Sequence, residues 1–269
     1  MQHPLSFCLR NLCFLMIFTW AYGACTFLIG AGMEELLFGT IRMRIPDAQF
    51  RVSTDSMVLA DFCRLPPQAR VLDLGCGCGT LGLLLLGAAP EVFADGIEIQ
   101  PDAARQAAQN AEENGLADRF RVFCGDLRQM PPELAPGSYD CVVSNPPYYP
   151  PGSGHLRRED SLSIARSELM CPLDALCAAA VRALRWGGRF FLVHKPERLT
   201  DLLCALRAVR LEPKRIRFVR HRAQSAVSLV LLESRLGGRP GLQYEPDLVL
   251  YEPDGSASAD CRRIYHQQE

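Results

Sequence analysis

The sequence predicts an α/β fold, a doubly wound and mainly parallel sheet of seven strands that ends in an antiparallel hairpin. Short apolar runs alternate regularly with segments of helical periodicity between residues 70 and 209. A glycine-rich turn follows the first run, and a polar side chain follows each of the next three. At 269 residues, 48% of them hydrophobic, the chain can bury the core of one large domain.

Each element has its own local signal. The helix from Asp102 begins with Pro101 in a favoured position, and Asn114-Gly115 ends it. The expected strands are Val71–Leu74, Val92–Ile99, Phe120–Cys124, Cys141–Ser144 and Arg189–His194, with Arg215–Val219 and Ala226–Leu232 as the terminal hairpin. The expected helices are Leu81–Leu86, Asp102–Asn114, Pro172–Leu184 and Glu197–Val209.

A glycine-rich turn joins the first strand to the first of these helices. Glycine at positions 75, 77 and 79 lets the backbone approach a ligand closely and adopt positive φ without strain. Glu98 ends the next strand, where a carboxylate can accept hydrogen bonds from both hydroxyls of a ribose. Asp126 follows the third strand, where it can accept a hydrogen bond from an adenine amine. Counted from Gly75, the position of the last glycine in the dinucleotide pattern Gly-x-Gly-x-x-Gly is Thr80, which argues against NAD. A nucleoside without a pyrophosphate fits better, and S-adenosylmethionine is such a ligand.

The strand that ends at Ser144 runs directly into Asn145-Pro146-Pro147-Tyr148. Two consecutive prolines stop the strand in a rigid, extended turn. That turn holds the Asn145 amide and the Pro146 carbonyl as a pair of acceptors, with the Tyr148 ring beside them. Two acceptors and an aromatic face suit a planar group that carries an NH2.

Together these motifs resemble the class I S-adenosylmethionine-dependent amino-methyltransferases, which have a Rossmann-like fold. Softer matches at Phe50–Ala60, Ala165–Glu168, Phe190–Leu199 and Gly237–Gly241 resemble the subgroup of bacterial tRNA1(Val) adenine-N6 methyltransferases. The resemblance covers roughly Met33 to Asp254 and implies methylation of an adenine next to the anticodon of a tRNA. It implies tRNA as the partner and S-adenosylmethionine as the methyl donor. The candidate cofactor-binding residues are Thr54, Asp73, Gly75, Gly77, Gly79, Glu98, Ile99, Asp126 and Leu127.

Two other functions stay open on the sequence alone. A protein glutamine-N5 methyltransferase that acts on a release factor would present a side-chain amide NH2 to the same turn. A non-catalytic RNA-binding protein could keep the fold, although the complete set of Gly75, Glu98, Asp126 and Asn145 argues against it.

The net charge of −1 gives no overall signal for nucleic acid, but the charge is unevenly distributed. Residues 182–222 hold twelve Lys and Arg against three acids, an excess of nine positive charges. The alternatives are a solvated surface or a phosphate-binding strip for RNA. The candidate RNA-binding residues are Arg157, Arg158, Lys195, Lys214, Arg215 and Arg217.

The five histidines are scattered and the twelve cysteines form no Cys-x-x-Cys pair, so no metal site is expected. Cys76 and Cys78 lie within the glycine turn, where a disulfide would be awkward, which favours a reducing, cytoplasmic location.

The amino-terminal residues 1–32 stand apart from the rest of the sequence. Leu12–Ile29 is apolar enough for a membrane span or a signal segment, although few positive charges flank it. Gly30-Ala-Gly-Met33 instead suggests a mis-assigned start, because its codons could contain a ribosome-binding element before Met33. The expected organisation is an apolar segment over 1–32, a methyltransferase domain over 33–254 and a polar tail over 255–269.

Overall fold

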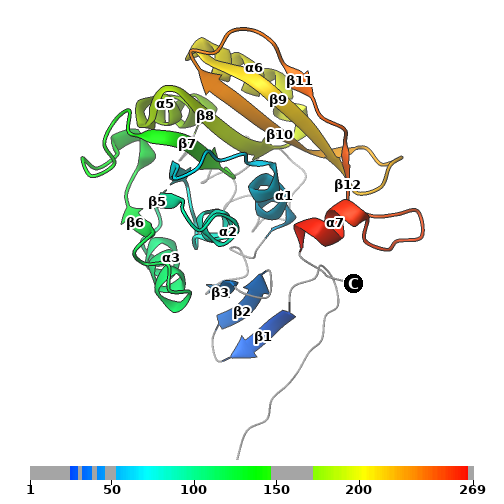
Figure 1. Ribbon diagram of the computed structural model, residues 1–269, viewed down its shortest axis with the longest axis horizontal. Helices are drawn as coiled ribbons and strands as arrows, with labels where there is room; N and C mark the ends of the chain where they lie inside the picture. The colour runs from blue at the N-terminus through cyan, green and yellow to red at the C-terminus, as the bar shows by residue number, and fades with distance from the viewer. Residues whose placement is uncertain (1–24, 30–31, 38–40, 46–52, 147–171, 266–269) are drawn as a thin grey trace, which may run out of the picture.

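The computed structural model describes residues 25–29, 32–37, 41–45, 53–146 and 172–265 of the chain. Its centre is a nine-stranded sheet in the order β11-β9-β10-β8-β7-β4-β5-β6, with β12 also paired to β9 (Figure 1). The seven long strands are β4 (Arg70–Leu74), β5 (Phe93–Glu98), β6 (Phe120–Cys124), β7 (Tyr139–Ser144), β8 (Leu184–His194), β9 (Leu211–Arg220) and β10 (Val227–Leu236).

Strands β4 to β8 pair in parallel, and β10 lies antiparallel between β8 and β9. The predicted fold class, a mainly parallel sheet with a terminal antiparallel hairpin, is therefore confirmed. Two short strands, β11 (Gln243–Tyr244) and β12 (Leu248–Val249), extend the seven predicted strands to nine. A two-residue strand is too short to produce a periodic pattern, so neither strand could be predicted from the sequence.

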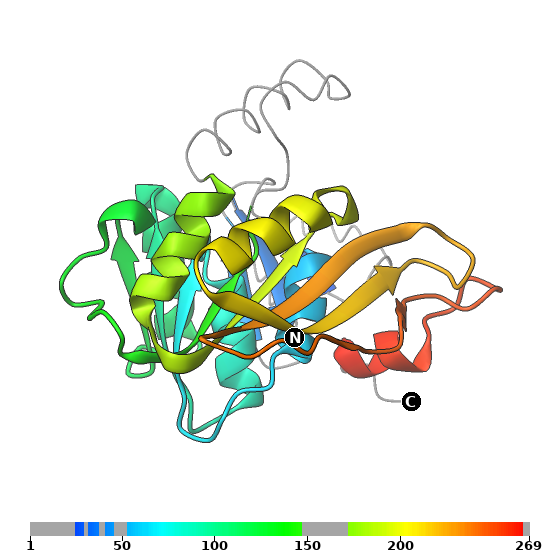
Figure 2. The ribbon, with the colours of Figure 1, turned by 90° about the horizontal axis from the view of Figure 1, so that it is seen from above.

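Helices cover both faces of the sheet (Figures 1 and 2). On one face α1 (Thr54–Phe62), α2 (Thr80–Ala88) and α3 (Pro101–Glu113) bury their apolar side chains, and on the other α5 (Leu173–Ala183) and α6 (Leu199–Ala208) do so. Each central strand contributes alternate residues to the two cores, as β8 does with Phe191 on the α1 face and Phe190 on the other.

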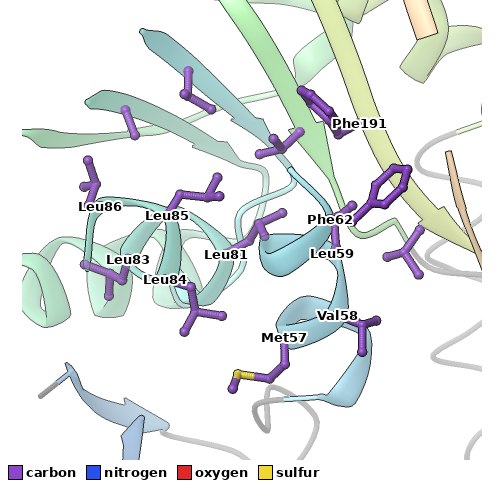
Figure 3. Close-up of a cluster of buried hydrophobic side chains, with 14 of the residues drawn as sticks. Met57, Val58, Leu59, Phe62, Leu81, Leu83, Leu84, Leu85, Leu86 and Phe191 are labelled. Carbon is purple, nitrogen blue, oxygen red and sulfur yellow. The ribbon is translucent and has the colours of Figure 1, made fainter. Parts of the chain in front are cut away.

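Helix α2 is apolar on nearly its whole circumference because α1, the sheet and strand β3 (Ile41–Ile45) enclose it. Its five leucines, Leu81 and Leu83 to Leu86, are all buried (Figure 3). Helix α1 presents Phe62 edge-on to Phe191 of β8, with ring centroids 6.5 Å apart. Helix α1 is not among the helices predicted from the sequence, although Ser53 is its N-cap and accepts a hydrogen bond from the Ser56 backbone N–H.

Three amino-terminal strands form a separate antiparallel sheet, β1 (Cys25–Ile29), β2 (Gly32–Leu37) and β3. The predicted domain start at Met33 lies within β2, and most of the apolar segment Leu12–Ile29, for which a membrane span, a signal segment and a mis-assigned start were the alternatives, lies outside the described residues. Its described part, Cys25–Ile29, is a strand paired with β2. Within the ranges given above, no helix is both long and apolar enough to cross a membrane.

Asn110 of α3 connects this small sheet to the glycine turn. Its fully buried amide accepts from the Arg44 N–H at 2.9 Å and donates to the carbonyl oxygens of Arg44 and Cys78 at 3.1 and 2.9 Å. We expect Asn110→Ala to lower the free energy of unfolding by about 1–3 kcal/mol, because the buried Cys78 carbonyl loses this donor. Urea denaturation measures the loss. Asn114→Ala, which removes similar contacts to Arg42 at a more exposed position, is the matched control and should have a smaller effect.

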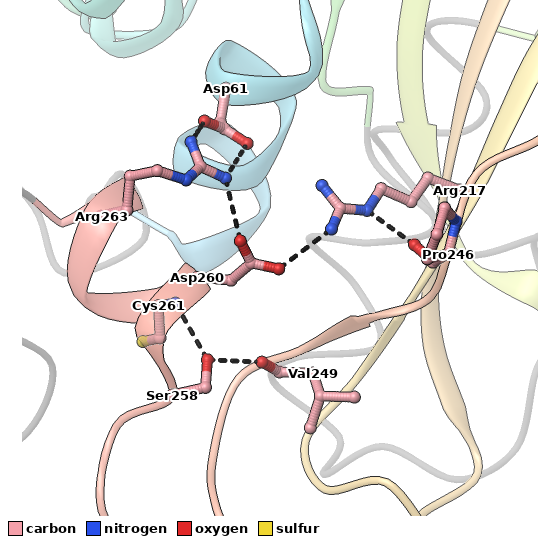
Figure 4. A network of polar contacts seen from close by, with 8 residues as sticks. All are labelled: Asp61, Arg217, Pro246, Val249, Ser258, Asp260, Cys261 and Arg263. Atoms are coloured by element: carbon pink, nitrogen blue, oxygen red, sulfur yellow. Dashed lines mark hydrogen bonds and ion pairs between the residues drawn. The ribbon is translucent and has the colours of Figure 1, made fainter.

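The carboxyl-terminal residues 255–265, expected as part of a polar tail, contain α7 (Ala259–Ile264), and Cys261 and Ile264 of this helix are buried. Figure 4 shows the polar contacts that fix α7 against α1 and β9. Arg263 pairs with Asp61 of α1, and Asp260 pairs with Arg217 of β9 at 3.1 Å. Isolated helical sequences of this length are marginal, so these tertiary contacts hold α7 in place.

Candidate functional site

Four polar or glycine positions lie side by side at the carboxyl edge of the sheet. Gly75, Glu98, Asp126 and Asn145 follow or end β4, β5, β6 and β7, which are neighbours in the order β7-β4-β5-β6. Ligands of open parallel sheets bind at this edge, next to the point where the strand order reverses. The sheet topology therefore brings together the main site residues that the sequence predicted.

The glycine turn has the backbone conformation that its sequence predicts. Gly75, Gly77 and Gly79 have φ angles of 75°, 55° and 87°. A Cβ on Gly79 would lie 3.0 Å from the Phe120 ring and 3.2 Å from the Ala107 Cβ, so close packing also requires glycine there. A Cβ on Gly75 would meet nothing within 4 Å among the described residues, so the turn leaves open space above this glycine.

Glu98 is held rigidly beside the glycine turn. Its side chain is buried, one carboxylate oxygen accepts from the Gly77 N–H at 3.0 Å, and the other accepts from the Gln100 N–H at 2.9 Å. A carboxylate oxygen has two lone pairs, so each of these atoms can accept a further hydrogen bond. The geometry fits two hydroxyls of a ribose placed over the turn.

Asp73 lies deeper, at the end of β4, where burial raises the pKa of its carboxyl to about 7, and the nearby charge of Glu98 adds to the shift. Its carboxylate accepts from the Gly82 N–H at 3.2 Å and so connects β4 to α2. This contact makes Asp73 a support of the turn. Ile99, beside Glu98, is 37% exposed and presents apolar surface at the same edge.

Asp126 is already engaged by a cation. It caps the short helix η2 (Leu127–Gln129), accepting from the Arg128 N–H at 2.9 Å, and both carboxylate oxygens also accept from the Arg128 guanidinium. These hydrogen bonds lower the pKa of the Asp126 carboxyl. An adenine amine at Asp126 would have to share the carboxylate with Arg128 or displace it.

The Asn145 side chain is oriented by two serines of the α1 amino terminus. Its amide nitrogen donates to Ser56 Oγ at 3.0 Å and lies 3.4 Å from Ser53 Oγ. Because the NH2 group donates to the two serines, the amide oxygen points away from them. In that direction it can accept a hydrogen bond from a substrate amine. Pro146 is buried, and Pro147 and Tyr148 lie outside the described residues.

Ser53 and Ser56 also belong to the candidate site, although neither was among the site residues predicted from the sequence. The available signal was Ser53-Thr-Asp-Ser56, which reads as the start of a helix. Thr54, predicted to bind cofactor, accepts a hydrogen bond from the Tyr265 hydroxyl at 3.1 Å and so connects α1 to the residue that follows α7.

The predicted RNA-binding residues do not gather on one face. Lys195 follows β8 at the carboxyl edge, and Lys214 lies in the first half of β9, three strands away from β7 in the sheet order. Arg215 is buried and pairs with Glu233, while Arg217 pairs with Asp260 and donates to the Pro246 carbonyl. Arg157 and Arg158 lie outside the described residues.

Acids from other segments neutralise much of the basic segment. Arg185 pairs with Asp140 at 2.8 Å and Arg220 with Asp247 at 2.5 Å, both from outside residues 182–222. The described residues contain no cluster of three or more His, Cys, Asp or Glu suited to a metal ion.

The family model described as "Methyltransferase small domain" matches residues 49–205 of this chain. The tRNA1(Val) (adenine(37)-N6)-methyltransferase of Yersinia enterocolitica is 34% identical over 144 residues, 53% of this chain and 56% of that protein. The protein of the same name from Yersinia pestis strain Pestoides F is 35% identical over 53% of this chain and 57% of its own length. The chain thus spans little more than half the length of these relatives.

Solved structures share the fold at low sequence identity. A predicted O-methyltransferase, Atu636 of Agrobacterium tumefaciens, superposes with a TM-score of 0.65 at 18% identity, over 79% of this chain and 96% of that one. TYW2 of Pyrococcus horikoshii in complex with MeSAdo superposes with a TM-score of 0.51 at 13% identity, over 81% and 73% of the two chains. At such identities the likeness establishes the fold alone.

Proposed function

Because the chain belongs to the methyltransferase small domain family, we propose that it transfers a methyl group from S-adenosylmethionine to the N6 amine of an adenine in tRNA. The observation that carries the proposal is the orientation of the Asn145 amide. Ser56 fixes this amide at the same edge of the sheet as the glycine turn and Glu98. The names of the Yersinia relatives support the substrate, a tRNA1(Val)-type adenine at position 37, next to the anticodon. The proposal places the enzyme in the cytoplasm.

The residues present fit S-adenosylmethionine. The open space above Gly75 accommodates a ligand close to the backbone, and the Glu98 carboxylate retains acceptor capacity for ribose hydroxyls. When bound, this molecule supplies a methyl group already activated by its sulfonium. The protein therefore needs to orient the two reactants more than it needs a strong acid or base.

Orientation of the acceptor amine is the task of Asn145 and Pro146. The lone pair of an adenine amine is delocalised into the ring, so the amine is a poor nucleophile in its planar form. Acceptors at the Asn145 oxygen and the Pro146 carbonyl would draw the amine toward tetrahedral geometry and aim its lone pair at the methyl carbon. Positioning of this kind can lower a barrier by several kcal/mol. The nitrogen gains a bond to the methyl carbon as the carbon–sulfur bond breaks, and the amine then loses a proton to water.

The adenine must leave its stack to reach this turn. We propose that Tyr148 stacks on the extruded base and offsets part of the energy of unstacking, with Pro147 keeping the turn rigid. The same turn could receive the side-chain amide of glutamine, so a release factor is the alternative substrate.

Transfer of a labelled methyl group to purified tRNA or to purified release factor separates these two substrates. Digestion of the tRNA to nucleosides, followed by mass spectrometry, should reveal N6-methyladenosine. Labelled release factor with unlabelled tRNA would favour the alternative. If neither substrate is methylated and the chain does not bind S-adenosylmethionine, the result would instead support a non-catalytic RNA-binding protein.

We expect Glu98→Ala to weaken S-adenosylmethionine binding by about 1–3 kcal/mol, because it removes hydrogen bonds between a charged group and the ribose. Isothermal titration calorimetry measures the change in Kd. Glu91→Ala, an exposed acid just before β5, is the charge-matched control and should bind like the parent. Unchanged affinity in a folded Glu98→Ala variant would remove Glu98 from the cofactor site.

A further inference from the structure

A basic pocket of about 230 Å³ is lined by residues of β8, β9 and β10, away from the carboxyl ends of β4 to β7 that form the candidate active site. Arg64, just after α1, lines it together with Arg189 of β8, Lys214 and Arg215 of β9, and Glu233 and Arg235 of β10. Five of these six residues are cationic. Only three of the five cations belong to the basic segment 182–222, so the pocket could not be predicted from the sequence alone.

The centre of the pocket is a fixed guanidinium. Arg215 is only 6% exposed, donates to the Phe62 carbonyl at 2.7 Å and lies 4.3 Å from the centroid of the Phe62 ring. Its Nε is 2.9 Å from Glu233 Oε2, a charge contact whose angle is too poor for a hydrogen bond. Glu245 pairs with Arg64 at 2.7 Å and approaches Arg215 at 3.5 Å.

Counting Glu233 and Glu245 against the five cations leaves an excess of three positive charges around the pocket. Lys214 and Arg235 account for much of it. The Lys214 ammonium donates to the Arg239 carbonyl at 3.1 Å, and the Arg235 Nε donates to the Gly187 carbonyl at 3.1 Å. In the part of the chain that the structure describes, neither side chain has an acidic partner.

An anion with several oxygens fits this arrangement. Arginine and lysine side chains donate up to five and three hydrogen bonds, and a phosphodiester offers them two non-bridging oxygens that share one negative charge. The rim is open to solvent, since the Arg64 and Arg189 side chains are 66% and 40% exposed, so a phosphate within a long polymer can reach it.

The position of the pocket matches an extended RNA substrate. On β8, Arg189 precedes His194, at the carboxyl edge, by five residues. At about 3.3 Å per residue this is about 17 Å, the length of about five base-pair steps. We propose that this pocket binds a backbone phosphate of the tRNA whose adenine occupies the active site, an inference that rests on the proposed function.

The test compares two double variants of the full chain. Lys214→Gln with Arg235→Gln removes the two cations that have only carbonyl partners. Arg42→Gln with Arg44→Gln removes the same charge from β3, where the hydrogen bonds to Asn110 and Asn114 involve backbone atoms and are retained. Fluorescence anisotropy with purified tRNA gives Kd over a range of salt concentrations, and methyl transfer gives KM and kcat.

The pocket variant should raise the Kd and KM for tRNA about tenfold at low salt and reduce the slope of log Kd against log salt by about 1–2. It should keep the kcat at saturating tRNA and the affinity for S-adenosylmethionine. The β3 variant should lose much less. Circular dichroism and thermal melting confirm that both variants fold.

The outcomes separate the pocket from the proposed function. A parent that methylates tRNA, with a pocket variant that keeps the parent's Kd and salt slope, overturns the pocket and leaves the function standing. A parent that binds tRNA through the pocket without methylating it overturns the function alone. If inorganic phosphate binds the pocket at low millimolar concentration and tRNA does not displace it, the pocket is a site for free anions. That result would overturn the assignment to RNA. A parent that does not bind tRNA overturns both.

Discussion

Asn145→Ala is expected to lower kcat for tRNA methylation by roughly 10²–10³. The asparagine oxygen is one of two acceptors whose hydrogen bonds strengthen as the amine becomes tetrahedral, so its loss should appear in kcat. The affinity for S-adenosylmethionine should stay near that of the parent, because Asn145 faces the acceptor amine. Single-turnover methylation of tRNA, with calorimetry for the cofactor, measures both quantities.

The contact between Asn145 and Ser56 allows a sharper version of this experiment. In the parent, Ser56→Ala removes the acceptor that holds the amide nitrogen at 3.0 Å, so the amide can turn and present its NH2 to the substrate. A carboxylate has oxygens on both sides and cannot be turned wrongly. Ser56→Ala should therefore reduce kcat about tenfold in the parent and much less in an Asn145→Asp background.

Equal losses in the two backgrounds would mean that Ser56 supports α1 without orienting the amide. Near-normal single-turnover rates in a folded Asn145→Ala variant would show that the turn does not contribute to catalysis. Because all these variants are compared at saturating S-adenosylmethionine, a change in cofactor affinity does not imitate either result.

Local sequence patterns predicted most of the sheet and much of the site. The seven long strands each have an apolar run, and the helix over Pro101–Glu113 has a proline at its start and Gly115, with φ 65°, after its end. The family was also inferred from short motifs, and the match to residues 49–205 confirms it. Each strand, helix and motif behind these predictions is a short, continuous stretch of sequence.

Contacts between distant segments could not be predicted in the same way. Ser56 and Asn145 are 89 residues apart, and Tyr265 meets Thr54 across 211 residues. The basic segment 182–222 is a similar case, because the acids that neutralise it, such as Asp140 and Asp247, come from other parts of the chain. Charge clustered in sequence predicts a binding surface only when the fold leaves that charge unpaired.

Arg215 provides the strongest test of this conclusion. The sequence placed it in an RNA-binding strip with Lys214 and Arg217, but its side chain is only 7% exposed and lies against the 9% exposed side chain of Glu233. Removing one member of a buried ion pair leaves the other charge without compensation, which typically costs about 3–5 kcal/mol. We expect Arg215→Ala to destabilise the fold by about this amount. Arg220→Ala, which breaks the more exposed pair with Asp247, should cost about 1 kcal/mol or less.

Removing the partner charge should restore most of this loss. Without Arg215 the Glu233 carboxylate is left buried, and the remaining cation near it, Arg189 at 3.8 Å, is more exposed. Urea denaturation of Arg215→Ala alone and combined with Glu233→Gln should therefore reveal a smaller deficit in the double variant, since no buried charge is then left. A deficit unaffected by Glu233→Gln would show that Arg215 acts through its packing on Phe62, and the ion pair would then contribute little to the fold.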